Sequence, residues 1–148
     1  MPTHSCSGKD KADSKALGAA ILQILQRVHI DDEHDIPYLA GYSKDGKTIY
    51  IDRHLPKRYD DKYLVLHEMV EKSLIDELGL PYEFAHAVAT AAERELVMLN
   101  GHNWVQYDTF MQKYIKTAEH EQLINLPQDL DLTPYGGKLF DNMINRMK

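Results

Sequence analysis

The organisation of this chain follows from residues 63–78, which read YLVLHEMVEKSLIDEL. At about 100° per residue on a helical wheel, the apolar side chains fall on one broad arc that contains Tyr63, Leu64, Leu66, Val70, Leu74, Ile75 and Leu78. His67 and Glu71 lie near the middle of this arc, Glu68 lies at its edge, and Lys72 faces the other way. A carboxylate at the centre of a buried stripe is unfavourable unless something pairs with it. The stretch therefore predicts a helix with a functional group on its core-facing side.

A second helix is predicted directly after the first. Gly79-Leu80-Pro81 is typical of a helix end, a turn and a new helix start, and the next helix extends from Tyr82 to about Asn100. This helix is apolar almost all round, which predicts that it is buried. It nevertheless contains His86 and Glu93, which are seven residues apart and lie on one stripe. Two neighbouring helices that each carry an inward His and an inward Glu indicate a shared site.

The N-terminal part of the chain combines a tail, a helix and a hairpin. Residues 1–12 are expected to be a disordered tail, and a helix is expected from residue 13 or 14 to Val28. The acidic residues 31–35 end that helix and are expected to form a solvated loop. Two β-like runs, at residues 36–43 and 47–52, flank an Asp-Gly pair and predict a β-hairpin.

The C-terminal part predicts further helices on the same domain. An aromatic stripe marks an amphipathic helix from Trp104 to about Leu123, and such a stripe is typical of a core. Residues 126–138 are expected to be irregular, and residues 139–147 a short helix that docks on the domain or on a second chain. Together these patterns predict one α+β domain over residues 13–148, with a helical extension from about residue 104.

Composition narrows the classes of function. A chain of 148 residues can bury a core without disulfides, and its single Cys6 favours a reducing, cytoplasmic location. No apolar run approaches the length of a membrane span, so no membrane partner is expected. A formal net charge of −6 argues against nucleic acid as the main partner.

The first helix contains a metal-site motif. His67-Glu68-x-x-Glu71 is a variant of the zincin motif HExxH, in which two ligands one turn apart share a metal and the Glu between them is the general base. A carboxylate oxygen is an acceptable zinc ligand. The motif therefore predicts that one divalent ion binds, and zinc is the first candidate. Manganese and nickel are the alternatives, because an anionic ligand favours harder or octahedral metals.

A third ligand is expected from the second helix. In an antiparallel helix pair with this turn, residues whose numbers sum to about 160 stand opposite each other. His67 then faces Glu93, and Glu93 is the expected ligand. His86 lies nearer the turn on the same face and is expected as a fourth ligand or an outer group.

The order of these elements resembles a known family. A hairpin at residues 42–52, a charged loop and the sequence LVLHE at residues 64–68 resemble the core of small zincin metallopeptidases of the ImmA/IrrE type. These proteins also place a helix before the hairpin and a helix with a ligand Glu after the motif. The resemblance covers residues 14–100 and rests on order and pattern. It implies a zincin-like domain and a peptide or protein substrate.

The resemblance also implies roles for individual residues. His67 and Glu71 correspond to the two zinc ligands of the motif, Glu68 to the general base, and Glu93 to the Glu that completes the site. The chain departs from the family at Glu71, where the family has a second His. This replacement of His by Glu affects both the preference for zinc and the peptidase activity that the resemblance implies.

Two other interpretations remain open. In the first, the chain is a non-catalytic zincin-like or helical adaptor whose buried His/Glu cluster is structural. Its C-terminal helices would then bind a protein partner or a second copy of the chain. The second is a ferritin-like carboxylate site, which needs Glu-x-x-His pairs on inward-facing helices. His67 does not belong to such a pair. The function that the pattern favours is a metal-dependent hydrolase with peptides as its substrate class.

Overall fold

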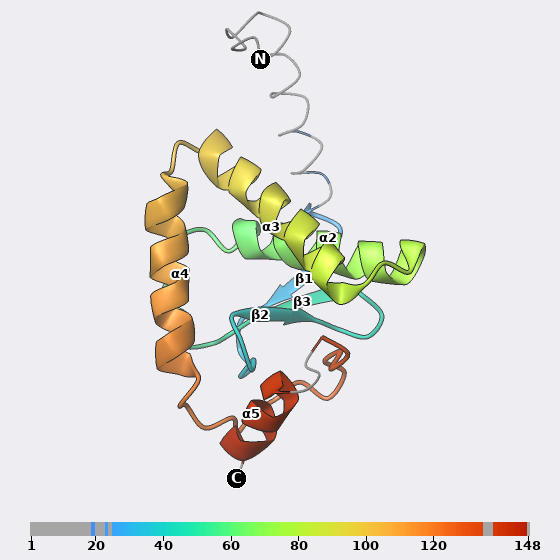
Figure 1. Cartoon of the computed structure of the whole chain (residues 1–148), viewed down its shortest axis with the longest axis vertical. Coiled ribbons are helices and arrows are strands. Elements are labelled where there is room, and N and C mark those ends of the chain that lie inside the picture. Colours follow the sequence, from blue (N-terminus) through green and yellow to red (C-terminus); the bar gives the residue numbers. More distant parts are fainter. Residues whose placement is uncertain (1–18, 20–22, 24, 135–137, 148) are drawn as a thin grey trace, which may run out of the picture.

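The computed structural model describes residues 19, 23, 25–134 and 138–147, and Figure 1 shows how they are arranged. The described elements are β1 (His29–Asp31), β2 (Ala40–Tyr42), β3 (Thr48–Ile51), α2 (Lys62–Leu78), α3 (Tyr82–Leu99), α4 (Trp104–Ala118) and α5 (Lys138–Arg146). A small sheet with a closely packed helix pair confirms the predicted α+β class. The predicted tail at residues 1–12 and most of the predicted N-terminal helix lie outside the described residues.

The small sheet is mixed, with strand order β1-β3-β2. The predicted hairpin is confirmed, because β2 and β3 are antiparallel with Gly41 opposite Tyr50. Gly46 in the turn has a φ of 72°, a conformation that favours glycine. β1 is parallel to β3 and was not predicted. Its three residues include one apolar side chain, Ile30, so the strand has no alternating pattern that a sequence could reveal.

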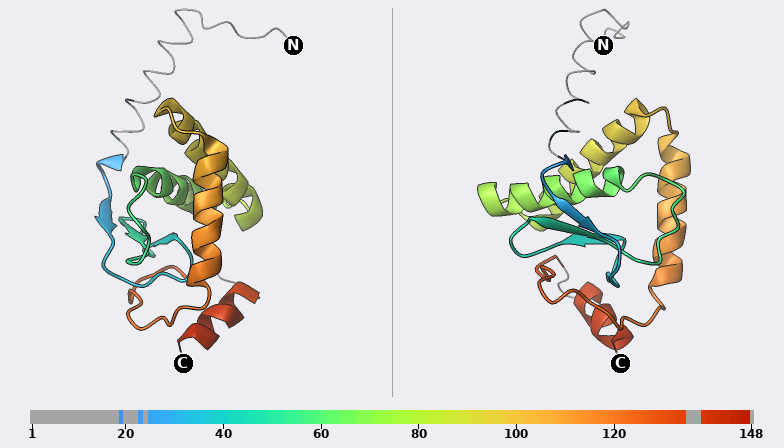
Figure 2. Two further views of the ribbon diagram at one scale, coloured as in Figure 1. Left: turned by 90° about the vertical axis from the view of Figure 1, so that its left-hand side faces the viewer. Right: turned by 180° about the vertical axis from the view of Figure 1, so that it is seen from behind.

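The helix pair covers one side of the sheet. α2 packs against α3 and also contacts β2 and β3. The predicted turn between the helices is present, since Gly79 ends α2 with a φ of 63° and its N–H donates to the carbonyl of Ile75 at 3.0 Å. In Figures 1 and 2, α4 runs beside both layers and α5 lies on the far side of the sheet from α2. The main core combines side chains of the sheet and three helices, among them Tyr42, Ile49, Ile51, Tyr63, Val65, Val97, Tyr107 and Met111.

The prediction that α3 is buried on all sides is wrong. Phe84 and Met98 are 57% and 54% exposed. The buried residues of α3 form one stripe, which consists of Ala85, Ala89, Glu93, Leu96 and Val97. α3 packs against α2 and α4, and no further layer among the described residues covers its outer face. Its many alanines therefore reflect helix propensity as well as burial.

The prediction that Lys72 faces away from the core is also wrong. Its side chain is buried, and its Nζ lies 2.8 Å from Asp131 and 2.9 Å from Asp76. The same Nζ lies 5.2 Å from the centre of the Tyr42 ring. Residues 129–131 return to the edge of β2, where the N–H of Asp131 donates to the carbonyl of Tyr42 at 2.9 Å. This long-range contact covers a helix face that a wheel diagram places in solvent.

Asp35 lies in the segment predicted to be a solvated loop, yet it is 1% exposed. Its Oδ2 accepts hydrogen bonds from the N–H groups of Ile124 and Asn125, both at 2.9 Å. Its Oδ1 accepts one from Arg53 Nε at 2.7 Å. Burial opposes ionisation of Asp35, but these hydrogen bonds outweigh it and hold the pKa of the carboxyl below its usual value. Asp35 therefore fixes the chain between α4 and α5.

Changing Asp35 to alanine is expected to lower the free energy of unfolding by about 3 kcal/mol, because buried donors lose their acceptor. The folded-state pKa lies below the unfolded value, so this stabilisation is present above about pH 4 and is lost as the pH falls through the folded pKa. Urea denaturation at pH 7 and pH 3 measures both effects. Asp32→Ala is the control, since Asp32 forms an ion pair whose two side chains are each 50% exposed. It should change stability by less than about 0.5 kcal/mol. Equal losses in the two variants would contradict the assignment.

The C-terminal helix docks on its own domain. Met143 is 2% exposed, and Arg146 donates to the carbonyl of Pro37 at 2.6 Å. α4 ends at Ala118, five residues or so before the predicted Leu123. Within the described ranges, no helix combines the length and apolar character needed to cross a bilayer.

Candidate metal centre

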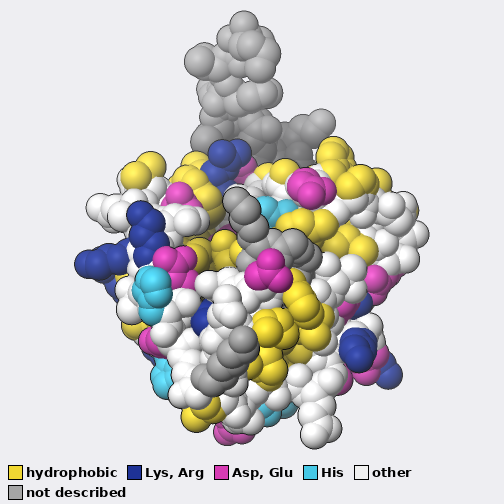
Figure 3. Space-filling model, turned by 60° about the horizontal axis from the view of Figure 1, so that its bottom comes forward, with side chains coloured by type: hydrophobic (Ala, Val, Ile, Leu, Met, Phe, Trp, Pro, Cys, Tyr) yellow, Lys and Arg dark blue, Asp and Glu magenta, His cyan; other side chains and the backbone are white. Residues whose placement is uncertain are grey.

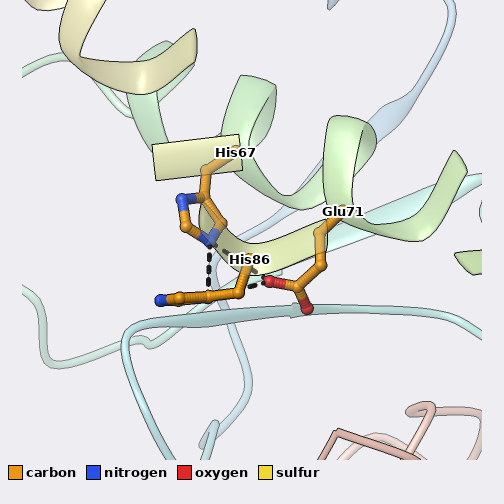
Figure 4. A group of neighbouring side chains, drawn as sticks. All are labelled: His67, Glu71 and His86. Atoms are coloured by element: carbon orange, nitrogen blue, oxygen red, sulfur yellow. Dashed lines mark hydrogen bonds and ion pairs between the residues drawn. The ribbon is translucent and has the colours of Figure 1, made fainter. Parts of the chain in front are cut away.

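Three side chains from the helix pair bring their ligand atoms together. His67 and Glu71 lie one turn apart on α2, and His86 lies in the second turn of α3. His67 Nε2 is 3.2 Å from Glu71 Oε2 and 3.2 Å from His86 Nδ1. The third side of the triangle, from His86 Nδ1 to Glu71 Oε2, measures 3.1 Å. Figure 4 shows the three side chains pointing toward one common point.

The size of this triangle fits a metal ion. Donor atoms about 2.0–2.1 Å from a tetrahedral zinc ion stand about 3.3 Å apart, close to the 3.1–3.2 Å separations seen here. Two imidazoles and one carboxylate are also a suitable donor set for zinc. The three groups can therefore hold a metal ion. Three protein ligands leave a fourth position, which is the arrangement of catalytic zinc sites.

Glu93 contacts His67 on the other side of the imidazole ring. Glu93 Oε1 lies 2.8 Å from His67 Nδ1, so the two residues face each other as the antiparallel register predicts. Glu93 Oε2 accepts a hydrogen bond from the hydroxyl of Tyr107 at 2.6 Å. A carboxylate on Nδ1 fixes the tautomer of a ligand His and directs the lone pair of Nε2 to the metal. His86 thus joins the group that could hold a metal, and Glu93 contacts His67 outside that group, whereas the sequence predicted Glu93 as the third ligand and His86 as a fourth ligand or an outer group.

Glu71 is also held from outside the triangle. The hydroxyl of Tyr42 on β2 donates to Glu71 Oε1 at 3.0 Å, which leaves Oε2 for the triangle. Tyr42 and Tyr107 are both nearly inaccessible to solvent. No sequence pattern marks Tyr42 as a site residue, and Tyr107 belongs to the aromatic stripe that predicts a core helix. A tyrosine that packs with its ring and bonds with its hydroxyl leaves no distinct signal in a sequence.

Glu68 lies on the wall of the same cavity as the ligand triangle. The residue is 9% exposed, and its pKa is raised to about 8, first by burial, which His67 opposes and which the charges of Glu71 and Glu93 reinforce. No hydrogen bond with a described residue contributes to this shift. A buried carboxyl with a pKa in this range suits a group that exchanges protons near neutral pH.

Opposite charges stabilise the cluster without a metal. Burial opposes protonation of His67, but hydrogen bonds with Glu71 and Glu93 raise its pKa to about 10. Burial likewise opposes ionisation of Glu71, but hydrogen bonds with His67, His86 and Tyr42 lower its pKa to about 2. The metal-free protein therefore carries a proton on His67 Nε2 at neutral pH. Protonated His67 stabilises the folded, metal-free protein. This contribution is fully present below the unfolded pKa of 6.5 and is lost as the pH rises through about 10.

Binding of zinc is expected to release at least one proton, because the metal must replace the proton on His67 Nε2. The apparent affinity should therefore rise at least about tenfold per pH unit between pH 6 and pH 8. Competition with a fluorescent chelator at three pH values measures the affinity. Calorimetry in two buffers with different ionisation enthalpies counts the protons. An affinity that is independent of pH would contradict the protonated state of His67.

A cavity of about 210 Å³ opens beside the triangle. Its polar lining residues include His67, Glu68, Glu71, His86, Tyr82 and Asp131. Its apolar lining residues come from α2, the start of β2, α4, α5 and the segment before α5, and they include Tyr38, Leu39, Leu64, Trp104, Met111, Ile115, Pro134 and Leu139. The candidate centre is thus open to a ligand much larger than water.

No family model matches the sequence, and no curated protein or solved structure is significantly similar to it. The geometry of the site is therefore the basis for inferring its function.

Proposed function

We propose that this protein is a metal-dependent hydrolase of zincin type that cleaves peptide bonds. The observation that carries the proposal is the combination of a three-ligand triangle with a buried carboxyl, Glu68, on the same cavity. His67, Glu71 and His86 would hold the ion, with Glu93 and Tyr42 orienting two of them. Zinc is the first candidate, and manganese and nickel are the alternatives.

A divalent metal bound at the triangle would polarise the substrate carbonyl and make water a stronger nucleophile at neutral pH. The charge of the ion would lower the pKa of Glu68 and favour its ionised form, so that Glu68 can accept the proton of the attacking water and return it to the leaving amine. Tyr82 lines the same cavity, and its hydroxyl lies 3.5 Å from His86 Nδ1. Burial, together with the nearby charges of Glu71 and Glu68, raises the pKa of Tyr82, so its hydroxyl stays protonated. It can donate a hydrogen bond to negative charge that develops on the substrate oxygen.

The edge of β2 supports a peptide as the substrate. Leu39 and Ser43 form backbone hydrogen bonds with β3, so the N–H and C=O of Ala40 between them point to the outer edge of the sheet. Residues 129–131 pair with this edge only after Ala40, at residues 42–44. Among the described residues, nothing pairs with the outward groups of Ala40, which lines the cavity. An extended peptide can pair with such an edge as an added strand.

The alternative is an adaptor in which the metal is structural. Structural zinc sites use four protein ligands and are closed. Here the three ligand atoms border a cavity, and the side chain of His86 is 47% exposed. These features favour a site that receives a substrate.

The test is cleavage of a mixture of synthetic peptides by the full-length protein, followed by mass spectrometry. We expect cleavage by protein loaded with zinc, loss of cleavage after 1,10-phenanthroline treatment, and recovery when zinc, manganese or nickel is added back. Absence of cleavage by protein that holds one ion per chain and melts at a lower temperature without it would favour the adaptor. Absence of any bound ion would remove both functions.

A further inference from the structure

Part of the apolar lining of the cavity comes from elements beyond the helix pair and the hairpin. Met111 and Ile115 lie one turn apart on α4, and Leu139 lies in the first turn of α5. Tyr38 and Leu39, which precede β2 and Ala40, line the same cavity. We use the term apolar arm for the part of the cavity that these five residues line.

Several of these side chains remain accessible although they are apolar. Tyr38 is 40% exposed and Leu139 is 38% exposed, and Ile115 is half-buried. Met111, one turn from Ile115 on α4, is buried and lines the same cavity. Figure 3 shows apolar side chains gathered on this face of the molecule, next to a His side chain and acidic side chains. Apolar side chains that border an open space are typical of a ligand pocket.

Two polar residues of α4 also line the cavity beside these apolar side chains. Asp108 and Gln112 of α4 border the cavity and bond to each other at 3.4 Å, so their polar groups are engaged with one another. No Lys or Arg is among the described residues that line the cavity. A negatively charged side chain placed in the arm would therefore lose water without gaining a cationic partner.

We propose that the apolar arm is the specificity pocket of this enzyme and accepts a large aliphatic or aromatic side chain next to the cleaved bond. The inference rests on the proposed function and names its substrate class, a peptide with a bulky apolar residue at that position. The strand edge at Ala40 binds the peptide backbone, and Met111 and Ile115 then select the side chain by apolar burial.

Binding of peptide hydroxamates tests the arm without requiring turnover. Two probes are compared on zinc-loaded protein by calorimetry. They are identical except for a leucyl or an alanyl side chain beside the hydroxamate, and acetohydroxamate serves as the reference without a side chain. We expect the leucyl probe to bind about 10- to 100-fold more tightly than the alanyl probe, because three more carbon atoms are buried.

Filling the arm should remove this preference. Ile115→Trp is expected to weaken binding of the leucyl probe at least about tenfold while leaving the alanyl probe and zinc content unchanged. Val105→Trp is the matched control, since Val105 is on the same helix, is 69% exposed and lies outside the cavity. It should bind both probes as the parent does. Ile115→Ala, which enlarges the arm, should shift the preference toward a phenylalanyl probe and serves if the tryptophan variant fails to fold.

The outcomes separate the two proposals. If all three hydroxamates bind with equal affinity, or if both Ile115 variants keep the parental preference, the arm does not select the side chain and the specificity pocket is refuted. The proposed metal-dependent function would stand in that case. If zinc-loaded protein binds no hydroxamate, including acetohydroxamate, the centre has no accessible metal position. The proposed function and its specificity pocket then fail together.

Discussion

Changing His86 to alanine is expected to lower the affinity for zinc by more than about 100-fold, because one corner of the ligand triangle is lost. His86 Nδ1 lies 3.2 Å from His67 Nε2 and 3.1 Å from Glu71 Oε2, and no other described residue is grouped with this pair at ligand distances. Glu93→Gln should lower the affinity less, by about 10- to 100-fold, since it weakens an outer hydrogen bond and keeps every ligand. Competition with a chelator of known affinity measures both variants.

His120→Ala is the control for this comparison. His120 is 84% exposed and lies outside the cavity, so its loss should leave the affinity for zinc unchanged. If Glu93→Gln loses the metal and His86→Ala keeps it, the ligand set expected from the helix register is right and the triangle is not the site. If neither variant loses the metal, α3 does not contribute a ligand.

The positions of His86 and Glu93 show what a helix register can and cannot predict. Counting from the turn correctly places Glu93 opposite His67, and their side chains meet at 2.8 Å. The count cannot show which ring nitrogen of His67 a facing residue contacts. A residue at Nε2 can share a metal with His67, whereas a residue at Nδ1 can only hold the ring from outside. It also treats the two helix axes as parallel, whereas Figure 1 shows α3 inclined to α2. His86 therefore reaches a residue that the register places more than a turn away.

Elements with strong local patterns were predicted well. The bounds of α2 and α3 and the hairpin turn at Gly46 follow from periodicity and turn chemistry. Features that depend on distant contacts were not predicted. Lys72 is buried because Asp131 returns to it, and Asp35 is buried because residues 124–125 bond to it. No local pattern records such contacts, since each joins residues more than 50 positions apart.

Some residues of the site could be predicted from local sequence patterns and others could not. His67, Glu68 and Glu71 could be selected from sequence, because burying ionisable groups near a core-facing stripe is unfavourable unless a partner or a function compensates. Tyr42 and Tyr107, which hold Glu71 and Glu93, could not be selected, because both rings belong to the apolar core. The apolar arm was also beyond reach, since it needs α4, α5 and the start of β2 in one place.

Changing Glu68 to glutamine is expected to lower kcat of the proposed peptidase by about 100- to 10,000-fold, because an amide of the same shape cannot accept a proton from water. Zinc content should stay at one ion per chain, since Glu68 is outside the group of three ligands. The metal-free variant should also melt at a higher temperature than the metal-free parent. The substitution removes a buried carboxyl whose pKa the nearby Glu71 and Glu93 help to raise to about 8.

Glu77→Gln is the matched control for this variant, because Glu77 lies on the same helix with an exposed side chain. It should leave kcat, zinc content and the melting temperature of the metal-free protein unchanged. Loss of zinc from Glu68→Gln would identify Glu68 as a ligand and leave the proposed base unassigned. Full activity with zinc retained would mean that another group accepts the proton. Tyr82 would be excluded from that role, because its raised pKa keeps the hydroxyl protonated. The three readouts together therefore distinguish a base from a ligand and from a purely structural carboxyl.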